Sequence, residues 1–227
     1  MKRLISMICW AAMSLVAVSA AQAADLSRAL SIVIDGSGSI DSTDFQTQKD
    51  AYVAVLGDAS VLVADGSVAV NVIQFSSFAQ IEQSAIRINN ETDRTTLLNS
   101  ISTMTQLNGL TAIGDGTNLG RSDMEAFLAG VTDLATDFAK IIDVSTDGFN
   151  NTGANPNVAS DNAGLDGYTV NCLAIGVGSC SFNDGEGIDF QANTFADLQP
   201  VLEDKIRLEL GTIPVPASLA LLSLGLI

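Results

Sequence analysis

Short apolar runs alternate along this chain with longer segments of helical period, and this alternation limits the folds open to it. Runs at residues 30–34, 141–145 and 168–177 are bounded by Gly, Asp and Asn, and a helix is expected over residues 45–56. Buried strands that alternate with helices are typical of a parallel sheet with crossover connections. The sequence therefore predicts an α/β fold with a doubly wound, mostly parallel sheet and helices on both faces.

A pair of neighbouring runs departs from this pattern. Residues 68–75 and 79–88 are separated only by a short turn at Ser76 and Ser77. A connection this short cannot hold a crossover helix, so it indicates an antiparallel hairpin. We expect this hairpin to supply one antiparallel strand at the edge of the sheet.

Further helices are expected in the rest of the chain. Thr92 or Asp93 is expected to cap the next helix, and another follows the Gly-rich stretch 108–116. The polar segment 150–162 is read as a loop with one short helix after its proline. A final amphipathic helix is expected over residues 195–210, with its charged side chains largely on one side.

The N-terminal segment has the pattern of a secretory signal peptide. Lys2 and Arg3 precede an apolar run, and small residues at Ala21 and Ala23 form a cleavage pattern. The alternative, a membrane anchor, is less favoured because the apolar run is short for a spanning helix. We therefore expect residues 1–24 to be removed and the folded domain, residues 25–211, to be exported to the periplasm, the cell surface or the medium.

The C-terminal tail, residues 212–227, is expected to form a separate element. Pro214 and Pro216 break the preceding helix, and the rest of the tail is almost uncharged. The Pro motif resembles the V-P-L-P-A form of a bacterial C-terminal sorting signal, which implies association with a membrane or the cell surface. The apolar stretch is too short to span a bilayer and no basic cluster follows it, so the signal is expected to be truncated. The alternative is a disordered hydrophobic tail.

Charge and composition exclude several classes of function. The chain has 10 Lys and Arg against 26 Asp and Glu, a formal net charge of −16, so nucleic acid would be repelled. Histidine is absent, which removes the usual general base of Ser and Cys hydrolases and the commonest ligand of catalytic zinc. The composition therefore argues against a nucleic-acid partner and against most hydrolases.

The cysteine content favours one disulfide. Cys172 and Cys180 are the only cysteines that remain after residues 1–24 are removed. An exported protein permits a disulfide, so we expect one between them. The alternative, two free buried thiols, is less favoured because no His or Lys nearby would activate a thiolate.

The segment most informative about function follows the first buried run. Asp35, Ser37 and Ser39 occupy alternating positions separated by glycines, between a predicted strand and a predicted helix. In open α/β sheets this edge is where ligands bind. One carboxylate and two hydroxyls offer hard oxygen donors, which suit Mg²⁺ or Mn²⁺. The sequence therefore predicts a divalent-cation site here.

These three residues match the D-x-S-x-S motif of von Willebrand factor type A (VWA) domains, which resemble this chain over about residues 26–210. The family's second loop carries a Thr in a G-x-T-x-x-G setting, matched here by Thr111, and its third loop ends a strand in T-D-G, matched by Asp147. All three loops are expected at the carboxyl ends of strands. The resemblance implies a metal-ion-dependent adhesion site (MIDAS) formed by Asp35, Ser37, Ser39, Thr111 and Asp147.

Other acidic residues are read differently. Asp143 lies inside an apolar run, and a buried carboxylate needs a hydrogen-bonding partner or a raised pKa, but the sequence does not identify the partner. Asp41 and Asp44 are expected to cap the first helix, with a second cation site as the alternative. The acidic stretch 183–189 is read as a solvated loop, because its spacing misses the EF-hand pattern of a Ca²⁺ site.

The predicted function is that of an exported binding module rather than an enzyme. The resemblance implies that Mg²⁺ in the MIDAS binds an Asp or Glu carboxylate of a partner protein. A Mg²⁺-dependent phosphoryl-transfer enzyme is one alternative, but such a site would want a second carboxylate where Ser37 stands. A structural surface protein, in which the metal only stabilises the fold, is another.

Overall fold

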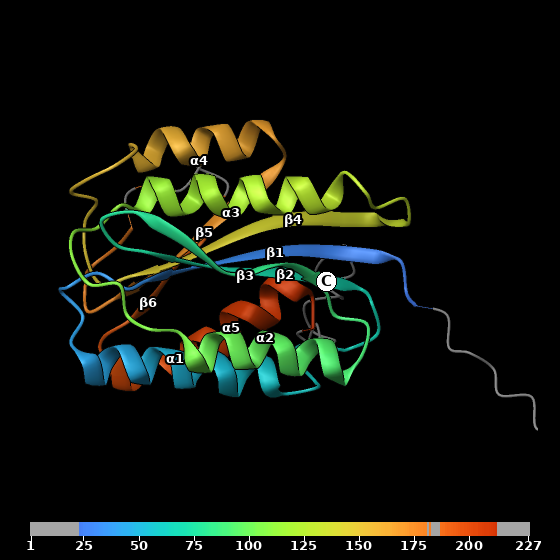
Figure 1. Cartoon of the computed structure of the whole chain (residues 1–227), viewed down its shortest axis with the longest axis horizontal. Helices are drawn as coiled ribbons and strands as arrows, with labels where there is room; N and C mark the ends of the chain where they lie inside the picture. Colours follow the sequence, from blue (N-terminus) through green and yellow to red (C-terminus); the bar gives the residue numbers. More distant parts are fainter. Residues whose placement is uncertain (1–22, 181, 183–186, 213–227) are drawn as a thin grey trace, which may run out of the picture.

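A six-stranded sheet forms the middle layer of the computed structural model, which describes residues 23–180, 182 and 187–212 (Figure 1). The strand order is β3-β2-β1-β4-β5-β6, and every neighbouring pair is parallel except β2 and β3. The strands are β1 (Leu26–Asp35), β2 (Val68–Phe75), β3 (Ala79–Arg87), β4 (Leu134–Thr146), β5 (Tyr168–Ile175) and β6 (Asp189–Ala192).

Helices cover both faces of this sheet. Those on one face are α1 (Ser42–Gly57), α2 (Glu91–Thr103) and α5 (Leu198–Leu210), with a 3₁₀ turn, η1 (Phe195–Asp197), before α5 (Figure 1). Those on the other face are α3 (Ile113–Leu128) and α4 (Pro156–Leu165). Among the described residues, no helix is long and apolar enough to cross a membrane.

The strand β1 shows why the sequence folds in this way. Its apolar side chains alternate between the two faces, so that Ile32 and Ile34 pack toward α1 and α5 while Val33 packs toward α3. A strand covered on both faces reads as a continuous apolar run, and residues 32–34 show such a run after the buried Ser31. The predicted α/β fold class and the antiparallel hairpin are both confirmed, because β3 pairs with β2 at the edge of the sheet.

The structure corrects two expected boundaries. Asn90, rather than Thr92 or Asp93, caps α2, because its side chain accepts hydrogen bonds from the backbone N–H groups of both residues. The reading of 183–189 as a solvated loop is wrong at its end, since Asp189 begins the short strand β6. Residues 183–186 of that stretch lie outside the described residues, as do residues 1–22 of the predicted signal peptide and residues 213–227 of the tail.

The expectation of an amphipathic last helix with its charged side chains largely on one side is also wrong in part. Lys205 and Glu209 are buried, because the i and i+4 positions of α5 lie on the same face as Leu202 and Ile206. Lys205 makes an ion pair with Asp143 of β4. This contact supplies the partner for Asp143 that the sequence does not identify.

Candidate metal site

Two parallel strands bring the aspartates of the site together. Asp35 is the last residue of β1, and Asp147 directly follows the last residue of β4. The two strands are neighbours in register, with Ile34 opposite Ser145. Their carboxyl ends therefore place both carboxylates at one edge of the sheet, as open α/β folds do with their ligand sites.

The loop after β1 turns tightly around the Asp35 carboxylate. The Ser37 backbone N–H donates to Asp35 Oδ1 at 2.8 Å. Gly36 sits so close to Gln74 that a Cβ there would lie 2.0 Å from the amide oxygen of Gln74. Only glycine fits at this position, because the main chain must approach the neighbouring strand β2.

A run of hydroxyl groups connects the two carboxylates. The Ser37 and Ser39 hydroxyl oxygens lie 3.0 Å apart, and the Ser39 hydroxyl donates to Asp147 Oδ1 at 2.7 Å. At the other end the Thr146 hydroxyl donates to Asp35 Oδ2 at 2.6 Å. Asp35, Ser37, Ser39 and Asp147 thus belong to one hydrogen-bonded network.

Thr111 reaches the same edge by a different route from the one expected. Its loop does not follow a strand but connects α2 to α3, and it is fixed to the first loop where the Gly38 N–H donates to the Gly109 carbonyl at 2.9 Å. Gly109 has a φ of +105°, which favours glycine. The Thr111 N–H donates to the Asn151 side chain at 2.8 Å, which joins the second loop to the third.

Both carboxylates of the site have pKa values above the usual range of an aspartate. Burial raises the pKa of Asp35 to about 6 against the lowering effect of its hydrogen bonds with Ser37 and Thr146, and the nearby Asp147 adds to the rise. Burial likewise raises the pKa of Asp147, with a further contribution from Asp44. Within the described part of the chain, neither Asp35 nor Asp147 forms an ion pair with a Lys or Arg.

This donor set fits a hard divalent cation. Carboxylate and hydroxyl oxygens are the ligands that Mg²⁺ and Mn²⁺ prefer, and a cation would relieve the repulsion between Asp35 and Asp147. In the described residues, no three or more His, Cys, Asp or Glu side chains gather as they would in a site rich in charged ligands. A cation here would therefore depend on neutral hydroxyls for much of its coordination.

Several residues that support the site carried no sequence signal of their own. The Gln48 amide on α1 donates to the Asp35 carbonyl at 2.8 Å, and the Gln106 amide donates to the Ser37 carbonyl at 3.1 Å. Both fix the main chain of the first loop. Thr146 and Asn151 could have been singled out, because each lies close to Asp147 in the third-loop motif.

The neighbouring acidic residues Asp41 and Asp44 are placed at the start of α1. Asp41 is the N-cap of this helix, and its carboxylate accepts from the N–H groups of Thr43 and Asp44 at 2.8 and 2.9 Å. This geometry agrees with the capping interpretation rather than with a second cation site.

The two cysteines lie together beside the same edge of the sheet. Cys172 is in β5, Cys180 follows that strand, and their Cα atoms are 6.1 Å apart with the sulfur atoms bonded. This pairing anchors the segment that follows β5 to the sheet.

Solved structures with a similar fold are VWA-type domains. Proximal thread matrix protein 1 from the mussel byssus aligns with a TM-score of 0.64 and 22% identity, over 84% of this chain and 49% of that chain. A von Willebrand factor type A protein from Catenulispora acidiphila aligns with a TM-score of 0.60 and 16% identity, over 82% and 43% of the two chains. The fold is therefore that of a VWA-type domain, as the sequence resemblance predicted.

Other similarities concern the kind of protein that carries this fold. The pilus adhesin SpaC from Lactobacillus rhamnosus GG aligns with a TM-score of 0.62 and 13% identity, over 82% of this chain and 30% of that chain. The mussel protein is also known with a zinc-occupied MIDAS motif. This chain spans about half the length of the mussel protein, and no curated protein matches it.

Within this class, the chain belongs to the family described as "Protein of unknown function (DUF1194)", whose model matches residues 25–211. The match covers the whole of the folded domain and includes every residue of the candidate metal site.

Proposed function

We propose that this chain is an exported binding module whose MIDAS, formed by Asp35, Ser37, Ser39, Thr111 and Asp147, holds Mg²⁺ or Mn²⁺. The observation that carries the proposal is the hydrogen-bonded linkage of three separate loops around two carboxylates that have no described cationic partner. A structural turn would need no such convergence of loops from distant parts of the chain.

In the proposed site the aspartates supply negative charge, and the hydroxyl residues supply neutral oxygen ligands. Asp35 is buried and fixed by Ser37 and Thr146, so it supplies a charge of fixed position. Ser37, Ser39 and Thr111 add neutral oxygens, so the ligand set only balances the charge of a divalent cation and adds no excess negative charge that would repel a further anion. When bound, the cation supplies the positive charge to which an Asp or Glu carboxylate of a partner protein can bind.

The fold comparisons support binding rather than catalysis as the kind of function. An adhesin and a thread matrix protein share the fold, although at these identities the likeness extends to the fold alone. A phosphoryl-transfer enzyme is less well supported, because Ser37 stands where such a site would need a second carboxylate.

Metal binding is tested by calorimetry with Mg²⁺ and Mn²⁺. Asp35→Ala and Thr111→Ala should each weaken metal binding, Asp35→Ala by about a hundredfold or more, while circular dichroism stays unchanged. Asp50→Ala is the matched control, since Asp50 is an exposed acid on α1. Unchanged metal affinity in Asp35→Ala would remove the site assignment.

Partner binding is tested separately. Mg²⁺-dependent capture of partners from an envelope extract should be lost in Asp35→Ala. A higher Mg²⁺ concentration should not restore it. A protein that binds Mg²⁺ tightly yet captures nothing in its presence would instead fit the structural alternative, in which the metal only stabilises the fold.

Export and the disulfide are parts of the same proposal. Mass spectrometry of the exported protein should find a new N-terminus at Ala24 or Asp25, and a product that retains Met1 would contradict export. Thiol labelling under denaturing conditions should find neither Cys172 nor Cys180 free. Association of the tail with a membrane or the cell surface is tested by fractionation of the chain with and without residues 212–227.

A further inference from the structure

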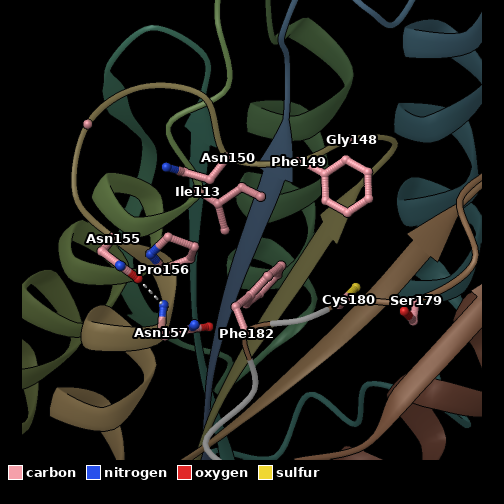
Figure 2. Close-up of a pocket in the computed structure, with 11 residues that line it drawn as sticks. Ile113, Gly148, Phe149, Asn150, Asn155, Pro156, Asn157, Ser179, Cys180 and Phe182 are labelled. Carbon is pink, nitrogen blue, oxygen red and sulfur yellow. Dashed lines mark hydrogen bonds between the residues drawn. The ribbon is translucent and has the colours of Figure 1, made fainter.

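A cavity of about 390 Å³ is lined by residues that adjoin the candidate metal site in sequence, and Figure 2 shows these lining residues. Its wall includes Gly148, which follows Asp147, and Ile113, which lies two residues beyond Thr111. Two of the three loops that form the metal site therefore continue into the cavity. A partner segment that binds at the candidate metal site could therefore extend into the cavity.

The lining combines apolar surface with uncharged polar groups. The apolar part comes from the side chains of Ile113, Phe149, Pro156 and Phe182. The polar part includes the side chains of Asn150, Asn157 and Ser179 (Figure 2). None of the described lining residues is charged.

The walls of this cavity are held in place by contacts that do not involve a ligand. The Ala154 N–H donates to Asp115 of α3, and the Asn155 side chain accepts from the Asn157 N–H at the start of α4. Cys180 is bonded to Cys172 of β5, which fixes the opposite wall. A cavity preformed in this way lowers the entropy cost of binding.

The aromatic side chains of the cavity differ in exposure. Phe182 is buried, whereas Phe149 is 72% exposed although it lies only two residues beyond Asp147. An exposed aromatic next to a candidate ligand site is typical of a contact surface, because such side chains bury much area at little entropy cost. Phe149 is therefore placed to contact whatever enters.

The chemistry of the lining selects one kind of side chain. A charged group would lose hydration and meet no opposite charge among the described lining residues, and an aliphatic group would cover the Asn157 amide without giving it a hydrogen bond. An aromatic ring with a polar tip satisfies both parts of the lining. A cavity of about 150 Å³ already accepts benzene, so this one accommodates a phenol ring together with part of the backbone that carries it.

We propose that this cavity receives a tyrosine side chain from the same partner segment that offers its carboxylate to the metal. The ring packs against Phe149 and Phe182, and the hydroxyl reaches the amides of Asn150 and Asn157 on the α4 side of the cavity (Figure 2). The inference rests on the proposed metal-dependent function and adds a sequence requirement to it: an acidic residue and a tyrosine close together in one peptide.

The test uses short acetylated peptides that contain one Glu and, one to four residues away, Tyr, Phe, Ala or Lys. With Mg²⁺ present, calorimetry should show the best Tyr peptide binding at least tenfold more tightly than its Ala counterpart, with Phe between them and Lys no better than Ala. Equal affinities for the Tyr and Ala peptides at every spacing would overturn the tyrosine proposal and leave the metal-binding function standing.

Protein variants assign the preference to this cavity. Phe149→Ala and Asn157→Ala should reduce the Tyr preference to about threefold or less without changing Mg²⁺ affinity. Both side chains are exposed, so the fold does not depend on them. Val158→Ala is the matched control, because Val158 is exposed on α4 but does not line the cavity. A Tyr preference that survives both variants would place the tyrosine elsewhere.

A final arm remains informative if the chain binds no metal. N-acetyltyrosinamide, added without Mg²⁺, should shift the NMR signals of Phe149 and Asn157 at millimolar concentration. Methyl glucoside, which has several hydroxyls and no aromatic ring, serves as the contrasting probe. Shifts with the glucoside but not with the tyrosine amide would overturn the proposal in favour of a sugar, whatever the outcome at the metal site.

Discussion

The protein contains two acidic clusters that balance their negative charge in different ways. The first lies at the edge of the sheet, where Asp35 and Asp147 are surrounded by hydroxyl groups. The second lies between the sheet and α5, where Asp143 and Glu209 share one lysine, Lys205. Both contain carboxylates that are fully buried, yet only the second has an internal cation among the described residues.

The α5 cluster is built as a permanent part of the interior. Lys205 Nζ lies 2.5 Å from Glu209 Oε1 and makes an ion pair with Asp143, and Asn171 donates to Glu209 at 2.8 Å. Burial by itself lowers the pKa of Lys205, but the Asp143 and Glu209 carboxylates raise it above its usual value. The two carboxylates therefore favour the charged form of Lys205 despite its burial.

The contrast teaches how one fold can hold carboxylates for two purposes. In the α5 cluster the lysine is part of the chain, so charge balance is fixed when the protein folds. At the sheet edge the chain supplies hydroxyls and, among the described residues, no lysine, so under the proposed function the balancing charge would come from a cation in solution. The α5 cluster is part of the folded interior. The sheet-edge cluster suits the proposed binding site, which needs to attract an anion from outside.

Replacement of Lys205, the buried counter-ion of Asp143 and Glu209, should have the largest effect on stability. Lys205→Met leaves Asp143 and Glu209 buried without a counter-ion, so the free energy of unfolding should fall by about 3–5 kcal/mol in denaturant titrations. The triple variant with Asp143→Asn and Glu209→Gln should recover most of this loss, since no unpaired charge remains.

The matched control for this prediction is Lys140→Met. Lys140 pairs with Glu125 in a partly exposed salt bridge, so its loss should cost about 1 kcal/mol or less. If Lys205→Met lowered the free energy of unfolding no more than Lys140→Met does, the α5 cluster would not have the structural role assigned to it here.

A cation from solution should stabilise the folded state through the first cluster only. Mg²⁺ at a hundred times its Kd should add about 2.7 kcal/mol to the free energy of unfolding. This increment, followed as a rise in Tm with Mg²⁺ concentration, should vanish in Asp35→Asn and persist in Asp143→Asn. An equal loss in both variants would show that the two clusters do not differ in this respect.

The second cluster should make stability depend on pH. Burial, together with Asp143, raises the pKa of Glu209 to about 7 although Lys205 opposes the rise. The folded protein then holds a proton that the unfolded chain releases, so stability should fall by about 2 kcal/mol as pH rises from about 4.5 to about 7. Thermal unfolding of Glu209→Gln across this range should show a smaller slope, and an identical slope would exclude Glu209 as its source.

The smallest effect is expected at the more exposed aspartate of the first cluster. Asp147 is half-buried and binds Ser39, so its charge is better screened by water than that of Asp35. Asp147→Ala should therefore weaken Mg²⁺ binding by about tenfold, or 1.4 kcal/mol, in calorimetry. A loss larger than that of Asp35→Ala would reverse the roles assigned to the two aspartates.

The sequence by itself determined the fold class and the residues of the candidate site. The apolar run that becomes β1 and the hairpin at Ser76 and Ser77 are local patterns, and local patterns specify which element forms. Asp35 and Asp147 follow two such strands, and the parallel arrangement of strand ends makes their meeting predictable. Metal binding itself stays a prediction that the variants above test.

Only the tertiary structure decided which distant side chains meet. The loop that carries Thr111 lies against the other two loops although it follows a helix, because the Gly109 carbonyl and Asn151 hold it there. Lys205 contacts Asp143 only when α5 packs on the sheet. A lysine from a helix whose charged side chains were expected on one side is therefore buried. The cavity beside Asp147 likewise takes its walls from α3, α4 and the segment after β5. Periodicity and motif spacing describe a chain's neighbours in sequence, whereas these contacts depend on how whole elements pack, and a single sequence carries no local signal of that.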